Sequence, residues 1–380
     1  MKKSLLALAV IGAFAGTAQA QSSVTVYGIL DMGYSSVNTK SSAAAPVETT
    51  TSGLNVAQPL SSSRIGFRGV EDLGGGLTAG FTIEGNVHAN PGTTGSNNAT
   101  AFQFGRHQFV TLTSKDAGGV LVGKTDSTVK QIMDAFDAGF SNNLTGAYDG
   151  MGTSLSDIDT SANVIGNRRD SVIRYTSPSL AGVNLSAGYM KNSLKTDTGA
   201  VSTTDTEDNT GYELGARFAQ GAIAAGLGYR SAKSQVVAAN AVAAVAGNAG
   251  TAAVVAANNV TNSWAAGLSY NAGPVIGYLQ YFNQAIKNEL NSTEVKENAF
   301  ALGLRAPLGA ATLFASYTTG GKTSAANIDS KMTGYQAGGL YALSKRTDLY
   351  ALYGASKMKA DNVANEGTGQ GMALGIRHTF

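Results

Sequence analysis

The sequence predicts an all-β fold, a 16-stranded antiparallel transmembrane β-barrel. Three observations predict it. Apolar residues alternate with small or polar residues in many short segments, the connections between segments alternate between long and short, and many apolar sets end in Tyr, Phe or Trp.

The alternation is clearest in residues 371–380, where one set of alternate positions holds Met372, Leu374, Ile376, His378 and Phe380. The same pattern recurs in residues 183–189, 212–218, 223–229, 264–270 and 300–304. A period of two indicates strands with one apolar and one polar face.

The composition of the two faces indicates which one points outward. Gly, Ala, Ser and charged residues occupy many of the polar-side positions, and they cannot form a dry core. A soluble β-sandwich would bury its apolar sets between two sheets. Aromatic residues at the ends of those sets are instead typical of the girdles of a membrane barrel. The sequence therefore favours an apolar outside and a polar inside.

The spacing of the segments supports a closed barrel. Sixteen segments begin near Val24, Ser63, Leu77, Gln103, Val120, Asp170, Val183, Gly211, Ala222, Ser263, Pro274, Ala299, Ala311, Thr333, Thr347 and Gly371. Long connections lie around 38–62, 89–102, 126–169, 191–209, 231–262, 283–298, 319–332 and 357–370. With seven short turns between them, both termini fall on the turn side. Because lipid satisfies no backbone group, the sheet must close around a water-filled lumen.

The N-terminus indicates export. Met1-Lys2-Lys3, an apolar run and Ala18-Gln19-Ala20 predict a signal peptide over residues 1–20, a mature chain from Gln21 and a single barrel domain over 21–380. Without Lys2 and Lys3 the 27 Lys and Arg residues become 25, which equals the 25 Asp and Glu residues. This balance gives no reason to expect nucleic acid as a partner.

The composition also limits metal and cofactor chemistry. There is no cysteine, and the three histidines lie far apart in the sequence, so we expect no metal site and no cofactor. The Ala- and Val-rich stretch 236–257 could suggest a membrane helix. Asn and Gly residues interrupt it, and a long surface loop is the favoured interpretation.

Residues 118–125, Gly-Gly-Val-Leu-Val-Gly-Lys-Thr, match the phosphate-binding pattern G-x-x-x-x-G-K-[ST]. A phosphate cradle needs successive N–H groups that turn inward, whereas Val-Leu-Val favours an extended chain. Export also removes the chain from cytoplasmic ATP. We therefore expect the match to be accidental, with the segment forming the strand that leads into the long loop 126–169.

Four segments carry a resemblance to a known family. They are Val24 to Asp31, Ser63 to Leu77 with its Ser-Arg-Ile-Gly-Phe-Arg-Gly start, Arg174 to Pro178, and the terminal Gly375 to Phe380. Together they strongly resemble the trimeric general porins of Gram-negative outer membranes, in the branch typical of β-proteobacteria, over essentially the whole mature chain.

The resemblance implies a non-specific diffusion channel in the cell outer membrane that passes ions and small hydrophilic solutes. It also implies a homotrimer surrounded by outer-membrane lipid and lipopolysaccharide. Its last strand would be recognised by the barrel-assembly machinery, and Leu374, Ile376 and Phe380 match that signal.

The resemblance further implies that the third long loop, 126–169, folds into the lumen and faces basic side chains on the wall. Strand alternation points Arg64, Arg68 and Arg174 inward, and Arg106 begins a strand whose opposite set includes His107 and Phe109. The expected constriction residues are Arg64, Arg68, Arg106, Lys124, Arg174, Asp134 and Asp137, with Arg168 and Arg169 as further candidates. Opposed Arg and Asp residues would create a transverse field.

The sign of the charge selectivity stays open at this point. The wall arginines favour anions, whereas Asp126, Asp134, Asp137, Asp149, Asp157 and Asp159 of the loop favour cations. We expect a weak anion preference. The alternative function is a substrate-specific channel of the same fold. A barrel enzyme that uses His88 is disfavoured, because no G-x-S-x-G motif accompanies that residue.

Overall fold

The computed structural model describes residues 23–42, 45–54, 59–87, 102–141, 168–197, 204–238 and 256–380. The strands are β1 (Ser23–Lys40), β2 (Glu48–Leu54), β3 (Arg64–Gly74), β4 (Leu77–Val87), β5 (Phe102–Ser114), β6 (Gly118–Asp126), β7 (Arg168–Thr176), β8 (Val183–Asp197), β9 (Thr204–Gln220), β10 (Ile223–Ala238), β11 (Ala256–Asn271), β12 (Ile276–Asn288), β13 (Glu294–Leu308), β14 (Ala311–Thr323), β15 (Asp329–Ala342), β16 (Thr347–Ala360) and β17 (Gly367–Thr379). The helix α2 spans Thr128–Ala135. Within these ranges, no helix combines the length and the apolar character needed to cross a bilayer.

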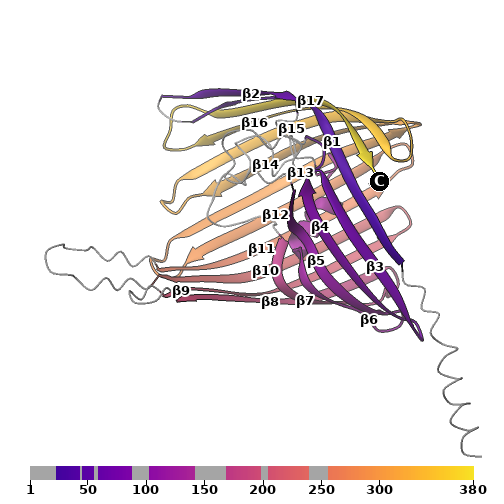
Figure 1. The fold of residues 1–380 in the computed structure, drawn as a ribbon. Helices are drawn as coiled ribbons and strands as arrows, with labels where there is room; N and C mark the ends of the chain where they lie inside the picture. Colours follow the sequence, from indigo (N-terminus) through magenta and orange to yellow (C-terminus); the bar gives the residue numbers. More distant parts are fainter. Residues whose placement is uncertain are drawn as a thin grey trace, which may run out of the picture.

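The strands form one closed antiparallel sheet (Figure 1). From β3 to β17 each strand pairs with the next along the chain, and β1 closes the ring by pairing with β17 over Ile29–Lys40 and with β3 over Ser23–Ile29. The short β2 pairs with Tyr34–Lys40 of β1, on the same edge of β1 that pairs with β3. Because β2 and β3 pair with successive parts of β1, they occupy a single strand position in the barrel. The barrel therefore has sixteen strand positions, and the predicted 16-stranded barrel is confirmed.

All sixteen predicted segments are strands, and β2 is the strand that the sequence pattern missed. Its sequence, Glu-Thr-Thr-Thr-Ser-Gly-Leu, has no apolar and polar faces to distinguish. Several strands also begin earlier than predicted; β9 begins at Thr204 and β11 at Ala256. Backbone pairing continues beyond the apolar band, where the alternation that reveals a strand ends.

The outer surface is apolar and carries aromatic residues on one side of the barrel. The strands from β7 to β16 carry exposed Tyr and Trp side chains, which are Tyr175, Tyr189, Tyr212, Trp264, Tyr270, Tyr317, Tyr335, Tyr341 and Tyr353. On β1 to β6, Tyr34 is the one exposed Tyr or Trp among the described residues, and the outer face there consists of Val, Leu, Ile and Phe. The strands also differ in length, with 9–13 residues in β3 to β7 and 13–17 in β8 to β17.

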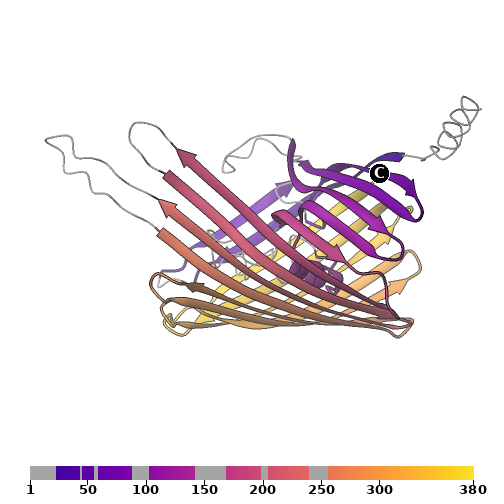
Figure 2. The same ribbon diagram turned by 90° about the horizontal axis from the view of Figure 1, so that it is seen from below.

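The helix α2 lies inside the ring of strands (Figure 2). Ser127 caps its N-terminus, with the side chain accepting a hydrogen bond from the N–H of Lys130. The buried face of the helix and the residue after it pack against inward-facing side chains of the wall. That cluster consists of Val129, Ile132, Met133, Phe136, Ala265, Phe282, Ala299 and Met332. The core of this protein is therefore the layer between the inward loop and the wall.

The phosphate-binding match lies within β6, as an extended strand that pairs with β5 and β7. Its first glycine, Gly118, ends a turn with a φ of 83°, and a Cβ there would lie 2.2 Å from the carbonyl oxygen of Thr176. That glycine is needed for close strand approach, and the segment offers no cradle of N–H groups.

Candidate pore constriction

A cluster of arginines and carboxylates lies on the inner wall formed by β3, β4 and β5. Glu84, which is 4 % exposed, is its centre. Arg106 donates from Nε to Glu84 Oε1 and from Nη1 to Asn86 Oδ1 at 3.2 Å. Arg64 Nη1 lies 4.0 Å from the same Glu84 oxygen. One carboxylate therefore faces two guanidinium groups, and the cluster keeps a positive charge.

Arg68 extends this cluster along β3. Its guanidinium lies over the ring of Tyr27 at 5.4 Å, and the Tyr27 hydroxyl donates to Glu84 Oε2 at 3.1 Å. The Arg68 side chain is exposed to the lumen. Cation–π contact holds the guanidinium near the wall and leaves its charge uncompensated.

A second part of the cluster gathers around Asp126, where the loop begins. Arg168 Nε lies 3.3 Å from Asp126 Oδ1, and His107 Nε2 lies 3.6 Å from Asp126 Oδ2. The expectation that Arg106 and His107 lie on opposite faces is wrong, because both contact interior groups. The β4–β5 register shifts between Ile83 and Gly85, and such a bulge turns consecutive side chains to one side.

Arg174 lies inside the barrel beneath the start of the loop, and it is only 6 % exposed. It donates to Glu213 Oε1 from Nε at 2.7 Å and also from Nη2, and it donates to the carbonyl oxygen of Asp126 at 2.7 Å. The other oxygen of Glu213 accepts from the N–H of Thr128 at 3.0 Å. This geometry fixes the base of α2 to the wall.

The two loop carboxylates named from the sequence have different surroundings. Asp134 pairs with Lys130 one turn earlier at 2.8 Å, on the exposed face of α2. Asp137 is buried, and it accepts from the N–H groups of Gly139 at 3.1 Å and Ser141 at 2.6 Å. Burial raises the pKa of the Asp137 carboxyl, and these two hydrogen bonds oppose that shift. Asp137 shapes the loop, and Asp134 is neutralised by its neighbour.

Lys124 does not join the interior set. It is the register partner of Gln108 and shares a strand face with Val122, whose side chain is exposed on the outer surface. It pairs with Asp170 at 2.9 Å beside an outer groove that Ile173 also lines. Because Lys124 lines this outer groove together with Val122, it points outward, and the expected contribution to the lumen is not supported.

Several residues of this interior were not predicted. The described loop is held to the far wall by Arg305, which donates to the carbonyl oxygens of Asp137 at 2.8 Å and Ala138 at 3.0 Å and lies over the ring of Phe140 at 3.7 Å. Glu84 and Glu213 were also missed. Each is one charged residue on an inward face, and only the fold shows which arginine it meets. His88, Asp149, Asp157 and Asp159, and the side chain of Arg169, lie outside the described residues.

A sequence model described as Gram-negative porin matches residues 7–361. The chain belongs to this family. It is 32% identical to outer membrane porin protein 32 of Delftia acidovorans and 30% identical to an outer membrane porin protein of Bordetella pertussis, in each case over 100% of both chains.

Solved porin structures share the fold. An anion-selective porin from Comamonas acidovorans aligns with a TM-score of 0.70 at 28% identity, over 94% of this chain and 100% of that chain. OmpT of Vibrio cholerae, solved in a trimer form, aligns with a TM-score of 0.60 at 17% identity, over 94% and 99%. This porin is therefore an outer-membrane diffusion channel, and its relatives are channels and not enzymes.

Proposed function

We propose that the channel has its constriction between the inward loop and the arginine wall, and that the constriction prefers anions weakly. The carrying observation is the charge balance of the wall: within the described part of the chain, the four arginines Arg64, Arg68, Arg106 and Arg168 lie beside two carboxylates, Glu84 and Asp126. Uncompensated cations in a narrow lumen raise the local concentration of anions.

The described part of the loop does not cancel this charge. Asp134 is paired with Lys130, and Asp137 is buried. The relative of known structure that is 28% identical is itself named an anion-selective porin, which agrees with the proposal. The test is the reversal potential of the purified channel in a planar bilayer with a KCl gradient. We expect chloride to be the more permeant ion, and potassium preference would overturn the proposal. Conductance that one solute saturates would favour the substrate-specific alternative.

We propose a homotrimer whose interface is the outer face of β1 to β5. An aromatic girdle suits strands that meet the lipid headgroups, because Tyr and Trp have an apolar body and a polar end. The described outer face of β1 to β6 carries aliphatic side chains and Phe instead, including Val26 at 51 %, Ile83 at 41 % and Val110 at 57 % exposure. A surface of that kind, on the side with the shorter strands, fits contact with a second copy of the chain.

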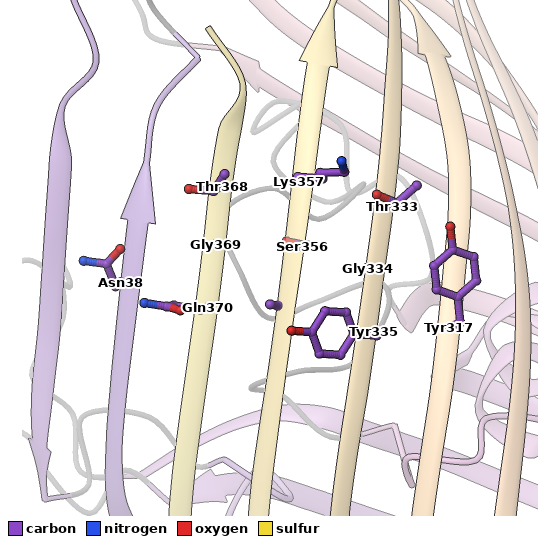
Figure 3. Close-up of a pocket in the computed structure, with 11 residues that line it drawn as sticks. Asn38, Tyr317, Thr333, Gly334, Tyr335, Ser356, Lys357, Thr368, Gly369 and Gln370 are labelled. Atoms are coloured by element: carbon purple, nitrogen blue, oxygen red, sulfur yellow. The ribbon is translucent and has the colours of Figure 1, made fainter.

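We propose that lipopolysaccharide contacts an outer groove over β1 and β14 to β17. The groove has a volume of about 530 Å³ and is lined by Asn38, Tyr317, Thr333, Tyr335, Lys357, Thr368 and Gln370 (Figure 3). Thr333 and Lys357 are register partners on β15 and β16, and two residues further from the short turn the register partners are Lys331 and Lys359. Like charges directly opposite destabilise a strand pair unless an anion lies between them. Phosphate groups would supply that anion, and the tyrosines and amides would contact sugar.

The proposed LPS contact can be tested by the phosphate that co-purifies with the trimer. Replacing Lys331, Lys357 and Lys359 with Gln should reduce bound lipopolysaccharide, whereas the same change at Lys233, on the extracellular side of β10, should not. Equal retention in both variants would count against this groove.

The last strand has the features of the proposed signal for the barrel-assembly machinery. Leu374, Ile376 and Phe380 are 65 %, 42 % and 41 % exposed on the outer face. The Phe380 backbone pairs with that of Gly28, through N–H···O contacts of 3.0 and 3.1 Å. A Cβ on Gly28 would lie 2.4 Å from the Phe380 ring, so the first strand makes room for the terminal aromatic.

A further inference from the structure

A second segment enters the barrel besides the loop that contains α2. Residues 59–63 precede β3, and Leu60 is only 1 % exposed. Leu60 packs with inward-facing side chains of the wall, which are Phe314, Leu340, Tyr350, Leu352 and Ala373. Phe140 of the loop packs against this same cluster, with its ring 5.7 Å from that of Phe314 in an edge-to-face contact. The two inward segments thus share one apolar base on β14 to β17.

A buried carboxylate on β1 holds the segment in place. Asp31 is 1 % exposed, and its Oδ2 accepts from the N–H groups of Leu60 at 2.9 Å and Ser61 at 2.5 Å. Its Oδ1 accepts from the hydroxyl of Tyr350 at 2.5 Å. The N–H of Asp31 donates to Ser63 Oγ at 2.9 Å. A buried carboxylate is costly unless such donors surround it, so the site is organised around the charge.

The segment connects this carboxylate to the proposed constriction. Arg64 follows it directly, and Arg64 Nε donates to the carbonyl oxygen of Ser62 at 2.9 Å. That bond uses one of the guanidinium donors and sets the plane of the group, which leaves Nη1 directed toward Glu84 at 4.0 Å. The Arg64 side chain keeps 22% exposure. Where the backbone of residues 61–63 lies therefore determines where this cation lies.

We propose that Asp31 is a positioning residue of the channel. It fixes residues 59–63 inside the lumen and thereby sets both the open area and the place of the Arg64 charge. Asp31 itself is buried and has no access to a permeating ion. The inference rests on the proposed function, because it assigns a role through Arg64.

Asp31→Asn is the first test. In an asparagine the one oxygen can accept from the N–H groups of Leu60 and Ser61, and the NH₂ group then faces the Tyr350 hydroxyl, so the substitution removes the charge that strengthens all three bonds. We expect higher single-channel conductance and loss of about half of the wild-type reversal potential, because the cation is no longer held. Tyr350→Phe removes one of the bonds and should shift both readings less, in the same direction. Asp116→Asn is the control: that carboxylate pairs with Lys115 at 2.7 Å in the exposed turn between β5 and β6, and its loss should leave both readings near wild type.

A double-mutant cycle with Arg64→Gln separates the inference from the proposed function. If Asp31 acts through Arg64, Asp31→Asn should lose its effect on selectivity in the Arg64→Gln background and keep its effect on conductance. An unchanged reversal potential in Arg64→Gln alone would overturn the proposed constriction. The positioning role would be overturned if Arg64→Gln changes the reversal potential while Asp31→Asn keeps wild-type conductance and selectivity. Additive effects of the two substitutions on selectivity would overturn it as well.

Folding of each variant is checked by trimer migration on gels before and after heating. Should Asp31→Asn fail to assemble, Ser63→Ala and Tyr350→Phe carry the same test. Ser63→Ala removes the acceptor of the Asp31 N–H, and Tyr350→Phe removes one donor to the carboxylate, while both keep Asp31 itself. Wild-type conductance and selectivity in both would contradict the proposal.

Discussion

The two sides of the barrel differ inside and outside. On the β1 to β6 side most strands are short, the outer face carries mainly Val, Leu, Ile and Phe, and the inner wall carries Arg64, Arg68 and Arg106. On the β8 to β17 side the strands are long, the outer face carries Tyr and Trp, and the inner wall is covered by α2 and residues 136–141. One side thus supplies charge to the lumen, and the other supports the segments that narrow it.

The same division explains the position of the buried polar groups. On the loop-covered side, Glu213 is 0 % exposed and Gln280 is 2 % exposed, and both bind backbone groups of the loop. On the arginine side, Arg64 and Arg68 stay accessible. A barrel wall whose inner face contacts water needs no packed core. Glu213 and Gln280 are therefore buried because the loop lies against the wall, whereas Glu84 and Arg106 on the arginine side are buried within a cluster of wall side chains.

The outer faces should differ most under substitution. We expect Phe67→Gln with Ile83→Gln, on β3 and β4, to abolish the trimer band on unheated gels, because these side chains lie on the proposed interface. Leu302→Gln with Leu304→Gln, on β13, should keep the trimer, since those side chains face lipid. If both pairs of substitutions leave the trimer intact, the proposed interface is wrong.

The inner faces should differ next in how they hold the loop. Glu213→Gln leaves Arg174 buried without a full charge partner, and breaking such a pair costs about 3–5 kcal/mol. We expect the barrel to remain folded and the loop to loosen, which protease cleavage within 126–169 and noisier single-channel currents would reveal. Asp348→Asn instead breaks an ion pair between β16 and β17. Equal cleavage in both variants would contradict the anchoring role of Glu213.

The smallest expected effect concerns Lys124. Because its side chain points outward and pairs with Asp170, Lys124→Gln should leave the reversal potential unchanged within error. Arg68→Gln removes a cation that is exposed to the lumen and should lower the anion preference. A shift from Lys124→Gln as large as that from Arg68→Gln would show that Lys124 reaches the permeation path.

The sequence predicted the barrel well because every strand has an apolar face in contact with lipid. Apolar residues therefore recur at every second position of each strand. It predicted the inward direction of Arg64, Arg68 and Arg174 by the same rule. The rule failed at His107, which a register shift turns inward together with Arg106. It could not show that Arg174 is buried beneath α2, because burial inside the lumen depends on the path of a loop with no periodic pattern.

Asp31 illustrates the same limit. In the sequence it follows Val24 to Leu30 as one more polar residue at the end of an alternating run. Its role becomes visible only when β1 is placed beside residues 60–63 and Tyr350 of β16, which lies 319 positions along the chain. Contacts among β1, β16 and the inward segment join residues that no local pattern connects.

The most direct test of the division between the two sides is the reversal potential in a KCl gradient for two variants. Arg64→Gln with Arg68→Gln removes charge from the arginine wall, whereas Lys130→Gln with Asp134→Asn removes the neutral pair from the exposed face of α2. The account predicts loss of the anion preference in the first variant and a near wild-type potential in the second. The reverse result would show that the loop, and not the arginine wall, determines which ions pass.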